Sequence, residues 1–360
     1  MARLSAEAAG RGLDAVAIMP GPNLTYLLGL SYHLSERPIL ALLPLDGPAA
    51  IVLPKLEAAK ISTASLDLQV FAYTDEEGYA AAFRDACAAT KLAARTVGVE
   101  ALRIRLVELR LLEQHAPCIR FIRAEDTLAS LRSHKDAHEI EQVRRAVQFT
   151  EAALETAVRQ LRVGTTEREL AARLTIEMLR LGADGPAFAP IVVACPNAAL
   201  PHAGPSDRPI GPGETITVDC GAAVGGYAAD ITRTFAIGQL PPDLMRVYET
   251  VRAANGAGRA EVHPGVSAET VDRAARAFID AAGYGQYFVH RTGHGLGLEI
   301  HEPPYIVAGN QAHLEPGMVF TIEPGIYLPG VGGVRIEDDV VVTSGGSESL
   351  TTFPRELILL

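Results

Sequence analysis

The sequence predicts a smaller α/β domain followed by a larger α+β domain that contains an internal duplication. Three observations lead to this fold class. The chain has 360 residues, which favours two domains of ordinary size. Residues 1 to 127 alternate strand and helix signals, whereas residues 128 to 360 repeat one order of helices, glycines and acid-bearing hairpins. We therefore place the domain boundary between residues 127 and 128.

The first domain is expected to contain short apolar strands and at least two helices. The expected strands are Asp14–Met19, Ile39–Pro44, Ala49–Leu53, Leu68–Tyr73 and Val97–Val99. Asp46–Gly47 lies between the second and third of these strands and predicts a hairpin. Helical patterns cover Gly78–Leu92 and Leu102–His115. This domain contains no nucleotide-binding fingerprint and no catalytic cluster, so we seek the function in the second domain.

The second domain begins with a long amphipathic helix over Ser133–Leu161, which a glycine ends. Thr166 then caps another helix, with Glu169 completing a capping box. The buried face of that helix is predicted to carry Leu170, Leu174 and Leu179, and the helix is predicted to end at Gly182.

The same order of signals returns about 101 residues later (265 − 164 = 101), where Gly265, the Ser267 cap, Val271–Phe278 and Gly283 repeat it. Chance similarity in a glycine-rich chain is the alternative, but the shared order, caps and hairpins argue against it. We expect the two halves to pack as a pseudo-twofold pair that shares one sheet, with their hairpins meeting near the axis.

Composition excludes several classes of protein. The formal net charge is −11, with no block of consecutive Lys or Arg, so neither nucleic acid nor an anionic membrane is expected as a partner. The four cysteines show no CxxC spacing, which favours reduced thiols: Cys87, Cys118, Cys195 and Cys220. No signal-peptide core and no apolar run of 18 residues is present. We therefore expect a cytoplasmic protein.

Two pairs of acids stand in equivalent hairpins. Asp219 and Asp230 flank a glycine-rich turn, and so do Glu323 and Glu337. Aligning Pro212–Gly213 with a second Pro-Gly pair 104 residues later (316 − 212 = 104) superposes Asp219 on Glu323. One acid near a turn is usually solvated, but two equivalent hairpins can bring four carboxylates together as a metal site.

A run of histidines and glycines, Val289–Pro304, is the third feature. His290, His294 and His301 are spaced by 4 and 7 residues (294 − 290 and 301 − 294). The intervening glycines are expected to let the backbone approach a ligand closely. A phosphate loop is excluded because Pro303–Pro304 prevents a following helix, and the chain has neither HExxH nor GxSxG. Metal chemistry remains as the favoured interpretation.

The candidate ligands are four carboxylates and one imidazole: Asp219, Asp230, His294, Glu323 and Glu337. Four carboxylates in one place repel unless cations neutralise them. A single zinc site would contain more nitrogen or sulfur, and the histidine disfavours calcium. Oxygen-rich ligation favours manganese, cobalt or ferrous iron. Two ions about 3.5–4 Å apart can share a bridging water and lower its pKa, which is hydrolytic chemistry.

These residues, in this order, resemble the dinuclear pita-bread metallopeptidases, a family that includes prolidase, Xaa-Pro aminopeptidase, methionine aminopeptidase and the metal-free creatinase. The resemblance covers about residues 130–350, and the first domain resembles the creatinase-type N-terminal domain. It implies hydrolysis of the bond before proline, in Xaa-Pro dipeptides, by a hydroxide bridging two divalent metals. Xaa-Pro aminopeptidase activity on longer peptides is the alternative, and a non-catalytic peptide-binding protein is a remote one.

The resemblance also implies roles for individual residues. Asp219 would bind one metal, His294 and Glu323 the other, and Asp230 and Glu337 both. Glu323 would also take a proton from the bridging water, and His301 would stabilise the tetrahedral intermediate. The remaining matches are the substrate-side His202 and His290, and Tyr327 and Arg335 at the edge of the metal site. For Arg335, a role as a partner of the bridging carboxylates is at least as well supported.

The implied cofactors are two divalent ions per chain, manganese or cobalt, with zinc or ferrous iron as alternatives. The implied partners are a proline-containing di- or oligopeptide and a second copy of the chain in a homodimer. One position departs from the family pattern. Some prolidases have an arginine four residues after the position of His301, where it meets the carboxylate of a dipeptide, and this chain has Tyr305. Arg291 or a residue of a partner's N-terminal domain would have to replace it.

Overall fold

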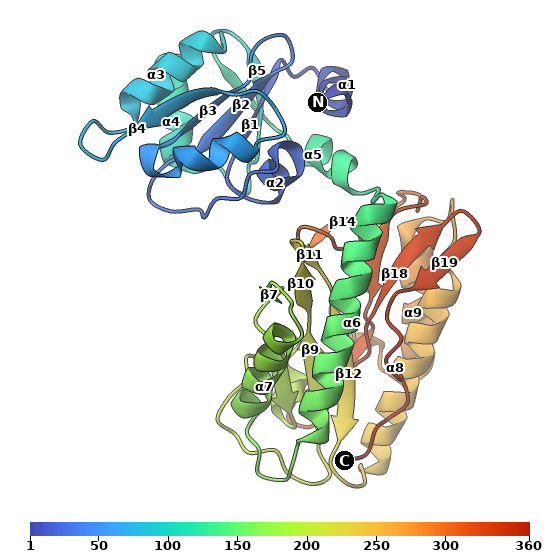
Figure 1. Ribbon diagram of the computed structural model, residues 1–360. Helices are drawn as coiled ribbons and strands as arrows, with labels where there is room; N and C mark the ends of the chain where they lie inside the picture. Colours follow the sequence, from blue (N-terminus) through green and yellow to red (C-terminus); the bar gives the residue numbers. More distant parts are fainter. The chain divides into compact units, whose positions relative to one another are not determined.

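The computed structural model describes residues 1–360 and divides into two compact units, Met1–Arg132 and Ser133–Leu360 (Figure 1). The boundary expected between residues 127 and 128 falls inside helix α5 (Glu125–Arg132). Leu128 and Leu131 of this helix belong to the hydrophobic core of the first unit, so the whole helix belongs there. The next helix begins only at Ala137, after the Asp136 cap.

The first unit is an α/β domain with one six-stranded mixed sheet in the order β4-β3-β2-β1-β5-β6. Its strands are β1 (Ala15–Ile18), β2 (Leu40–Pro44), β3 (Ala50–Pro54), β4 (Gln69–Tyr73), β5 (Thr96–Val99) and β6 (Arg120–Arg123). Its other helices are α1 (Ala2–Gly10), α2 (Pro22–Leu28), the 3₁₀ helix η1 (Lys55–Thr63), α3 (Ala80–Ala89) and α4 (Leu106–His115). The predicted hairpin at Asp46–Gly47 is confirmed, because β2 and β3 pair antiparallel around it. Val16 and Ala17 of β1 face different hydrophobic clusters, so both faces of the sheet are covered.

The second unit contains two pairs of helices around a set of antiparallel strands (Figure 1). The helices are α6 (Ala137–Arg159), α7 (Glu167–Arg180), α8 (Pro242–Ala260) and α9 (Ala268–Ala281). The predicted capping box of Thr166 and Glu169 is present, and Ser267 accepts a hydrogen bond from the Thr270 N–H. Thr166 and Ser267 each form an isolated β-bridge, to Pro209 and His313 respectively. The duplication expected from the sequence is therefore visible in the helix starts.

The strands of the second unit form two main sheets rather than the single shared sheet that we expected. One has the order β12-β9-β8, with β8 (Ile191–Ala194), β9 (Thr215–Cys220) and β12 (Ile231–Ala236). The other has the order β14-β13-β15-β18-β19, with β13 (Gly293–Gly295), β14 (Glu302–Ile306), β15 (Val319–Ile322), β18 (Asp338–Thr343) and β19 (Gly346–Ser349). A few hydrogen bonds, such as Glu337 N–H to Thr232 O at 3.0 Å, connect the two sheets, but no ladder joins them.

Short strands extend the turn of each hairpin. In the first half these are β10 (Ala222–Val224) and β11 (Tyr227–Ala228), and β7 (Gly185–Pro186), from before the hairpin, joins them in a small sheet by pairing with β10. In the second half they are β16 (Gly325–Leu328) and β17 (Gly332–Arg335), which pair with each other. Two further 3₁₀ turns lie at Asn197–Ala199 (η2) and Gly285–Tyr287 (η3). Each hairpin is thus longer and more elaborate than a simple glycine turn.

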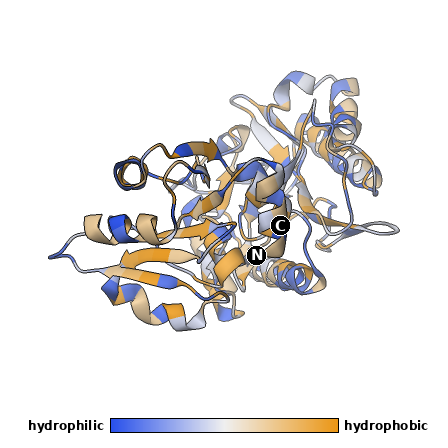
Figure 2. Cartoon of the chain, turned by 90° about the horizontal axis from the view of Figure 1, so that it is seen from above, coloured by the Kyte–Doolittle hydropathy of each residue, from blue (hydrophilic) through white to orange (hydrophobic).

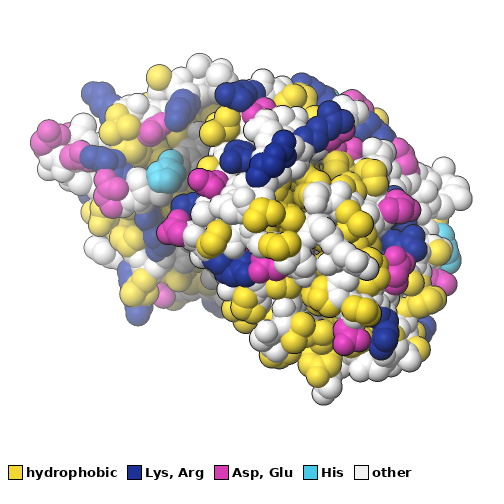
Figure 3. All heavy atoms as spheres, turned by 90° about the horizontal axis from the view of Figure 1, so that it is seen from below, with side chains coloured by type: hydrophobic (Ala, Val, Ile, Leu, Met, Phe, Trp, Pro, Cys, Tyr) yellow, Lys and Arg dark blue, Asp and Glu magenta, His cyan; other side chains and the backbone are white.

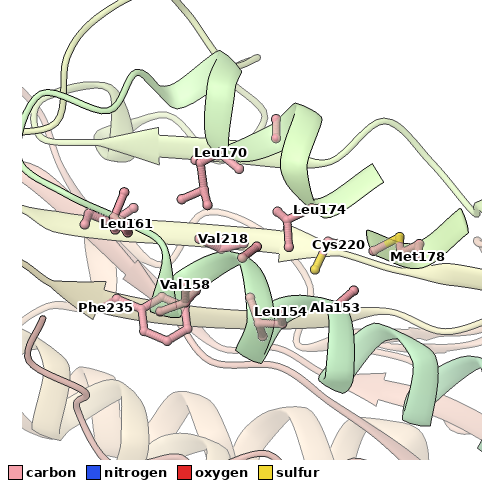
Figure 4. Packing of buried hydrophobic residues seen from close by; sticks show 14 of the residues in the cluster. Ala153, Leu154, Val158, Leu161, Leu170, Leu174, Met178, Val218, Cys220 and Phe235 are labelled. Atoms are coloured by element: carbon pink, nitrogen blue, oxygen red, sulfur yellow. The ribbon is translucent and has the colours of Figure 1, made fainter. Parts of the chain in front are cut away.

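The largest cluster of the second unit lies between α6, α7 and the strands β9 and β12 (Figure 4). Leu154 and Leu174 from the helices meet Val218 and Phe235 from the strands. Leu179, predicted to be buried, is 52% exposed, and Met178 occupies the buried face instead. The buried face of the helix contains residues 167, 170, 171, 174 and 178, which follow the i, i+3, i+4 spacing of one helix face.

The distribution of polar residues follows this packing. Figure 2 shows helices that carry both hydrophilic and hydrophobic residues, as amphipathic helices do when one face is buried. On the face shown in Figure 3, acidic and basic side chains are interspersed with hydrophobic and uncharged ones. None of the helices combines the length and apolar character needed to cross a bilayer.

Candidate metal centre

All five predicted ligands line one pocket of about 430 Å³ in the second unit. Asp219 lies in β9, and Asp230 directly precedes β12. His294 is the middle residue of β13. Glu323 directly follows β15, and Glu337 directly precedes β18. Acids from two hairpins and a histidine from a third segment therefore converge, although they are separated by up to 118 residues (337 − 219).

The imidazole of His294 is oriented toward the acids. Ligand atoms of Asp230, His294 and Glu337 all lie within 4.8 Å of one another. The Nε2 atom of His294 is 3.6 Å from Asp230 Oδ2 and 3.4 Å from Glu323 Oε1. Its Nδ1 atom lies 3.2 Å from the Gly295 carbonyl, to which it must donate a proton. Burial lowers the pKa of His294 to about 3, so the ring is neutral and Nε2 presents a lone pair suited to a metal.

The carboxylates are buried close together without enough positive charge around them. Burial, with the charges of the neighbouring acids, raises the pKa of Asp230 and Glu337 well above the usual range. Burial likewise raises the pKa of Glu323 to about 7. The Oδ1 atoms of Asp219 and Asp230 are buried and have no hydrogen-bond partner. Buried acids with unpaired oxygens need neutralising cations, and four carboxylates with one imidazole fit a pair of divalent ions.

Arg335 contacts the ligands rather than open solvent. Its Nη2 atom lies 2.5 Å from Asp219 Oδ2, and its Nε atom donates to Thr232 Oγ1 at 3.0 Å. Its Nη1 atom donates to Tyr327 OH at 2.9 Å and to the Pro201 carbonyl at 3.2 Å. Arg335 is only 3% exposed. Its guanidinium is therefore fully engaged in orienting Asp219 and Thr232.

Tyr327 and His290 continue this network on the other side of Arg335. His290 Nε2 lies 2.8 Å from Tyr327 OH, and His290 Nδ1 donates to the Arg291 carbonyl at 2.7 Å. Burial and the nearby Arg335 charge lower the pKa of His290 to about 4. Both ring nitrogens of His290 are thus engaged within the protein.

His202 and His301 also line the pocket, and both are exposed. The ring of His301 stands edge-to-face against that of His294, with centroids 4.2 Å apart. Burial and the charge of Arg291 lower the pKa of His301, which favours the neutral ring. Nine of the ten residues singled out from the sequence therefore line one site, and the tenth, Tyr327, reaches it through Arg335 and His290.

Comparison with known proteins agrees with this geometry. The model of metallopeptidase family M24 matches residues 141–344, and that of the creatinase/prolidase N-terminal domain matches residues 1–134. The chain belongs to metallopeptidase family M24. This confirms the resemblance inferred from the residues, and with it the pita-bread fold.

Relatives of this M24 chain include a probable dipeptidase, PepE, of Mycobacterium tuberculosis, 39% identical over 365 residues, 100% of this chain and 96% of that protein. A Xaa-Pro dipeptidase of Pyrococcus horikoshii is 36% identical over 349 residues, covering 96% and 95% of the two chains. The crystal structure of a prolidase from Thermococcus sibiricus superposes with a TM-score of 0.95 at 34% identity, covering 99% of this chain and 97% of that one.

The glycines of the M24 histidine run have a different role from the one expected. A Cβ atom at Gly293 would overlap the Thr321 carbonyl, and one at Gly295 would overlap the Pro303 carbonyl. Because β13 lies between β14 and β15, these positions must be glycine to let the neighbouring strands approach. At these two positions the structure therefore gives the glycines a packing role, and their expected approach to a ligand stays a prediction.

Several residues that support the candidate ligands were not predicted from the sequence. Asn255 of α8 donates to the carbonyls of Ile322 at 3.0 Å and Ile336 at 3.3 Å, each directly before a ligand. Asp339 Oδ2 accepts from the Asp230 N–H at 3.0 Å. The available signals were a polar residue on the buried face of a helix and an acid two positions after Glu337.

A buried ion pair holds the segment that carries His301. Lys135 Nζ lies 2.5 Å from Glu302 Oε1, and the two side chains are 1% and 3% exposed. Lys135 is itself fixed by its backbone N–H, which donates to the Gly317 carbonyl at 2.9 Å. Removing either charge would leave the other buried without its partner, so this pair fixes the backbone next to His301.

Proposed function

We propose that this chain hydrolyses the peptide bond before proline, with Xaa-Pro dipeptides as its substrates. The observation that supports this most strongly is that all five candidate ligands lie in one pocket. A chain that lacked any one of these five side chains would bind metal more weakly. The pocket is small, about 430 Å³, and its apolar walls include Phe188, Ile191 and Ile300, which suit a pyrrolidine ring. Relatives named dipeptidase or Xaa-Pro dipeptidase over the full chain length add to this support.

The proposed chemistry assigns separate tasks to the ligands and their neighbours. A pair of divalent ions held by the five ligands would supply a water of lowered pKa and polarise the scissile carbonyl. Glu323, 14% exposed at the pocket, would accept the proton of the attacking water. Neutral His301 would donate a hydrogen bond to the developing oxyanion. Arg335 would keep the Asp219 carboxylate in its orientation, through the 2.5 Å contact.

The identity of the ions, the compartment and the assembly are parts of the same proposal. The oxygen-rich ligand set supports manganese or cobalt, with zinc or ferrous iron as alternatives. The four free cysteines, three of them buried, support a reducing cytoplasm. A homodimer follows from the family resemblance, and sedimentation equilibrium would measure it directly.

The test is a metal-reconstitution assay. Protein stripped with a chelator would be reloaded with Mn²⁺, Co²⁺, Zn²⁺ or Fe²⁺ and given Xaa-Pro, Xaa-Ala and Xaa-Pro-Xaa peptides. We expect metal-dependent cleavage of Xaa-Pro and little cleavage of Xaa-Ala. If no reloaded form cleaves a proline peptide, the proposed function is wrong and the non-catalytic alternative gains support.

Xaa-Pro aminopeptidase activity is the second candidate, and Tyr305 is the observation in its favour. Some prolidases have an arginine at this position, where it meets the free carboxylate of a dipeptide. An enzyme without a cation for that carboxylate would have no reason to prefer dipeptides over longer peptides. Efficient tripeptide cleavage with poor dipeptide turnover would select this candidate.

A further inference from the structure

Two arginines line the pocket, and they differ in whether their guanidinium groups have hydrogen-bond partners. Arg335 is buried and donates to four partners, as described above. Arg291 is half-buried, and its guanidinium has no hydrogen-bond or ion-pair partner in the structure. The guanidinium lies over an aromatic ring, that of Tyr305, whose centroid is 4.5 Å from Arg291 Cζ. Arg291 is therefore the only arginine of the pocket with free donors.

The backbone that carries Arg291 is held on both sides. The Thr292 N–H donates to the Ile306 carbonyl at 2.9 Å, and Thr292 Oγ1 donates to Asp272 at 2.7 Å. On the other side, Arg276 of α9 donates to the His290 carbonyl at 3.0 Å. The position of the guanidinium is thus set by a fixed backbone and by the Tyr305 ring, and ordering it on substrate binding costs little conformational entropy.

Stacking on an aromatic ring leaves the edges of a guanidinium available. A cation over the face of Tyr305 is stabilised by the ring, but the ring accepts none of the five N–H groups in the guanidinium plane. Those groups form a planar fork that matches a carboxylate in two parallel hydrogen bonds. Tyr305, at the position where some prolidases have arginine, therefore supplies the platform while Arg291 supplies the charge.

We propose that Arg291, held on the ring of Tyr305, binds the C-terminal carboxylate of an Xaa-Pro dipeptide and thereby selects dipeptides over longer substrates. This inference rests on the proposed function. It identifies a cation for the dipeptide carboxylate, whose absence was the argument for the second candidate function. Arg291 lies on the same segment as His290 and His294. The scissile carbonyl must lie at the ligands, and the free carboxylate of the dipeptide is only one residue further along the substrate.

The test compares substrates that differ only in that carboxylate. The metal-loaded protein would be assayed with an Xaa-Pro dipeptide, its C-terminal amide and an Xaa-Pro-Xaa tripeptide. The measured quantity is the ratio of kcat/KM for the dipeptide to kcat/KM for the amide. We expect Arg291→Met to lower this ratio about 10- to 100-fold, the effect of losing a charge-assisted hydrogen-bond pair, mainly through KM. Arg291→Lys should retain part of the preference because it keeps the charge but not the fork.

Two further variants distinguish a binding role from a structural one. Arg273→Met removes an exposed arginine of α9 and should leave the ratio as in the parent protein. Tyr305→Phe keeps the ring and should preserve the ratio, whereas Tyr305→Leu removes the platform and should lower it by a smaller factor than Arg291→Met. Metal content and circular dichroism would show that each variant is folded and loaded.

The possible results separate this inference from the proposed function. If Arg291→Met lowers dipeptide and amide cleavage equally, Arg291 acts on the catalytic groups and the inference is wrong. If the ratio does not change, the carboxylate is bound by another cation, such as one from a partner's N-terminal domain. If the parent protein cleaves dipeptide and amide equally well, dipeptide selection fails while hydrolysis before proline stands. If it cleaves none of the peptides, the proposed function itself fails.

Discussion

The two acid-bearing hairpins are equivalent in sequence, but their acids are held by different backbone hydrogen bonds. In the first, the ladder between β9 and β12 includes a ligand, because Asp219 pairs with Thr232. In the second, the ladder between β15 and β18 ends at Ile322 and Asp338, so Glu323 and Glu337 lie just outside it. Their backbone N–H groups donate to other segments, Glu323 to the Thr292 carbonyl and Glu337 to the Thr232 carbonyl. The second hairpin therefore connects the histidine segment to the first hairpin.

The side chains show a matching difference. The two carboxylate oxygens of the centre that are both fully buried and unpartnered belong to the first hairpin, on Asp219 and Asp230. In the second hairpin Glu337 accepts from Thr232 Oγ1 at 2.6 Å, and Glu323 has a longer contact of 3.5 Å with Thr321 Oγ1. The first hairpin thus depends more on bound cations, and the second depends more on protein contacts. Mutations and metal removal should act differently on the two.

The largest effect is expected within the first hairpin. Asp230→Asn should release both ions and reduce kcat by at least about 10³-fold, because several kcal/mol of transition-state stabilisation come from the ions. Asp219→Asn should release mainly one ion. Metal analysis by mass spectrometry, together with kcat on an Xaa-Pro dipeptide, would measure both. Equal metal loss in the two variants would contradict the assignment of Asp230 as the ligand shared by both ions.

The next effect concerns the segment that joins the hairpins. His301→Ala should reduce turnover about 10²- to 10³-fold, the effect of removing one oxyanion donor, while metal content stays at the parent level. His138→Ala, at an exposed position of α6, is the matched control and should change neither quantity. If His301→Ala also loses metal, His301 is a ligand and not an oxyanion donor.

The candidate ligands could be identified from the sequence because they repeat. The acids recur in hairpins with the same turn signals, and the Thr166 and Ser267 caps recur at the same offset, so one half supports the other. The supporting contacts could not be found in this way. Asn255 meets carbonyls 67 and 81 residues away, and only the folded chain brings such partners together.

The other differences between the sequence predictions and the structure also depend on contacts between segments distant in the chain. Leu179 and Met178 are adjacent and both apolar, so a small rotation of α7 decides which one is buried. Gly293 and Gly295 are needed because neighbouring strands approach them, and that crowding depends on a strand order that the pattern of residues does not contain.

A matched pair of substitutions, one on a helix next to each hairpin, compares how much the hydrogen bonds from these helices contribute to the free energy of unfolding. Asn255→Leu would leave the carbonyls of Ile322 and Ile336 without this donor, at about 1–3 kcal/mol each. Thr150→Val on α6 removes one acceptor, that of the Ala222 N–H, and should cost about half as much. Urea unfolding of the metal-loaded proteins would measure both. If Thr150→Val costs as much as Asn255→Leu, the two hairpins do not differ in their dependence on protein contacts.

The smallest effect, and the one that separates cations from protein contacts, is a dependence on pH. In the metal-free protein, burial raises the pKa of Asp230 and Glu337 well above the usual range and that of Glu323 to about 7. As pH rises from about 4 toward 7, the unfolded chain releases these protons first, so the metal-free fold loses stability over this window. Divalent ions compete with the same protons and bind more tightly as pH rises. The difference in Tm between loaded and metal-free protein should therefore grow by several degrees from pH 5.5 to pH 8.

The variant Glu323→Gln should reduce this growth of the Tm difference, because it removes one of the titrating carboxylates. A Tm difference that stays constant from pH 5.5 to pH 8 would mean that the ions do not neutralise the buried carboxylates.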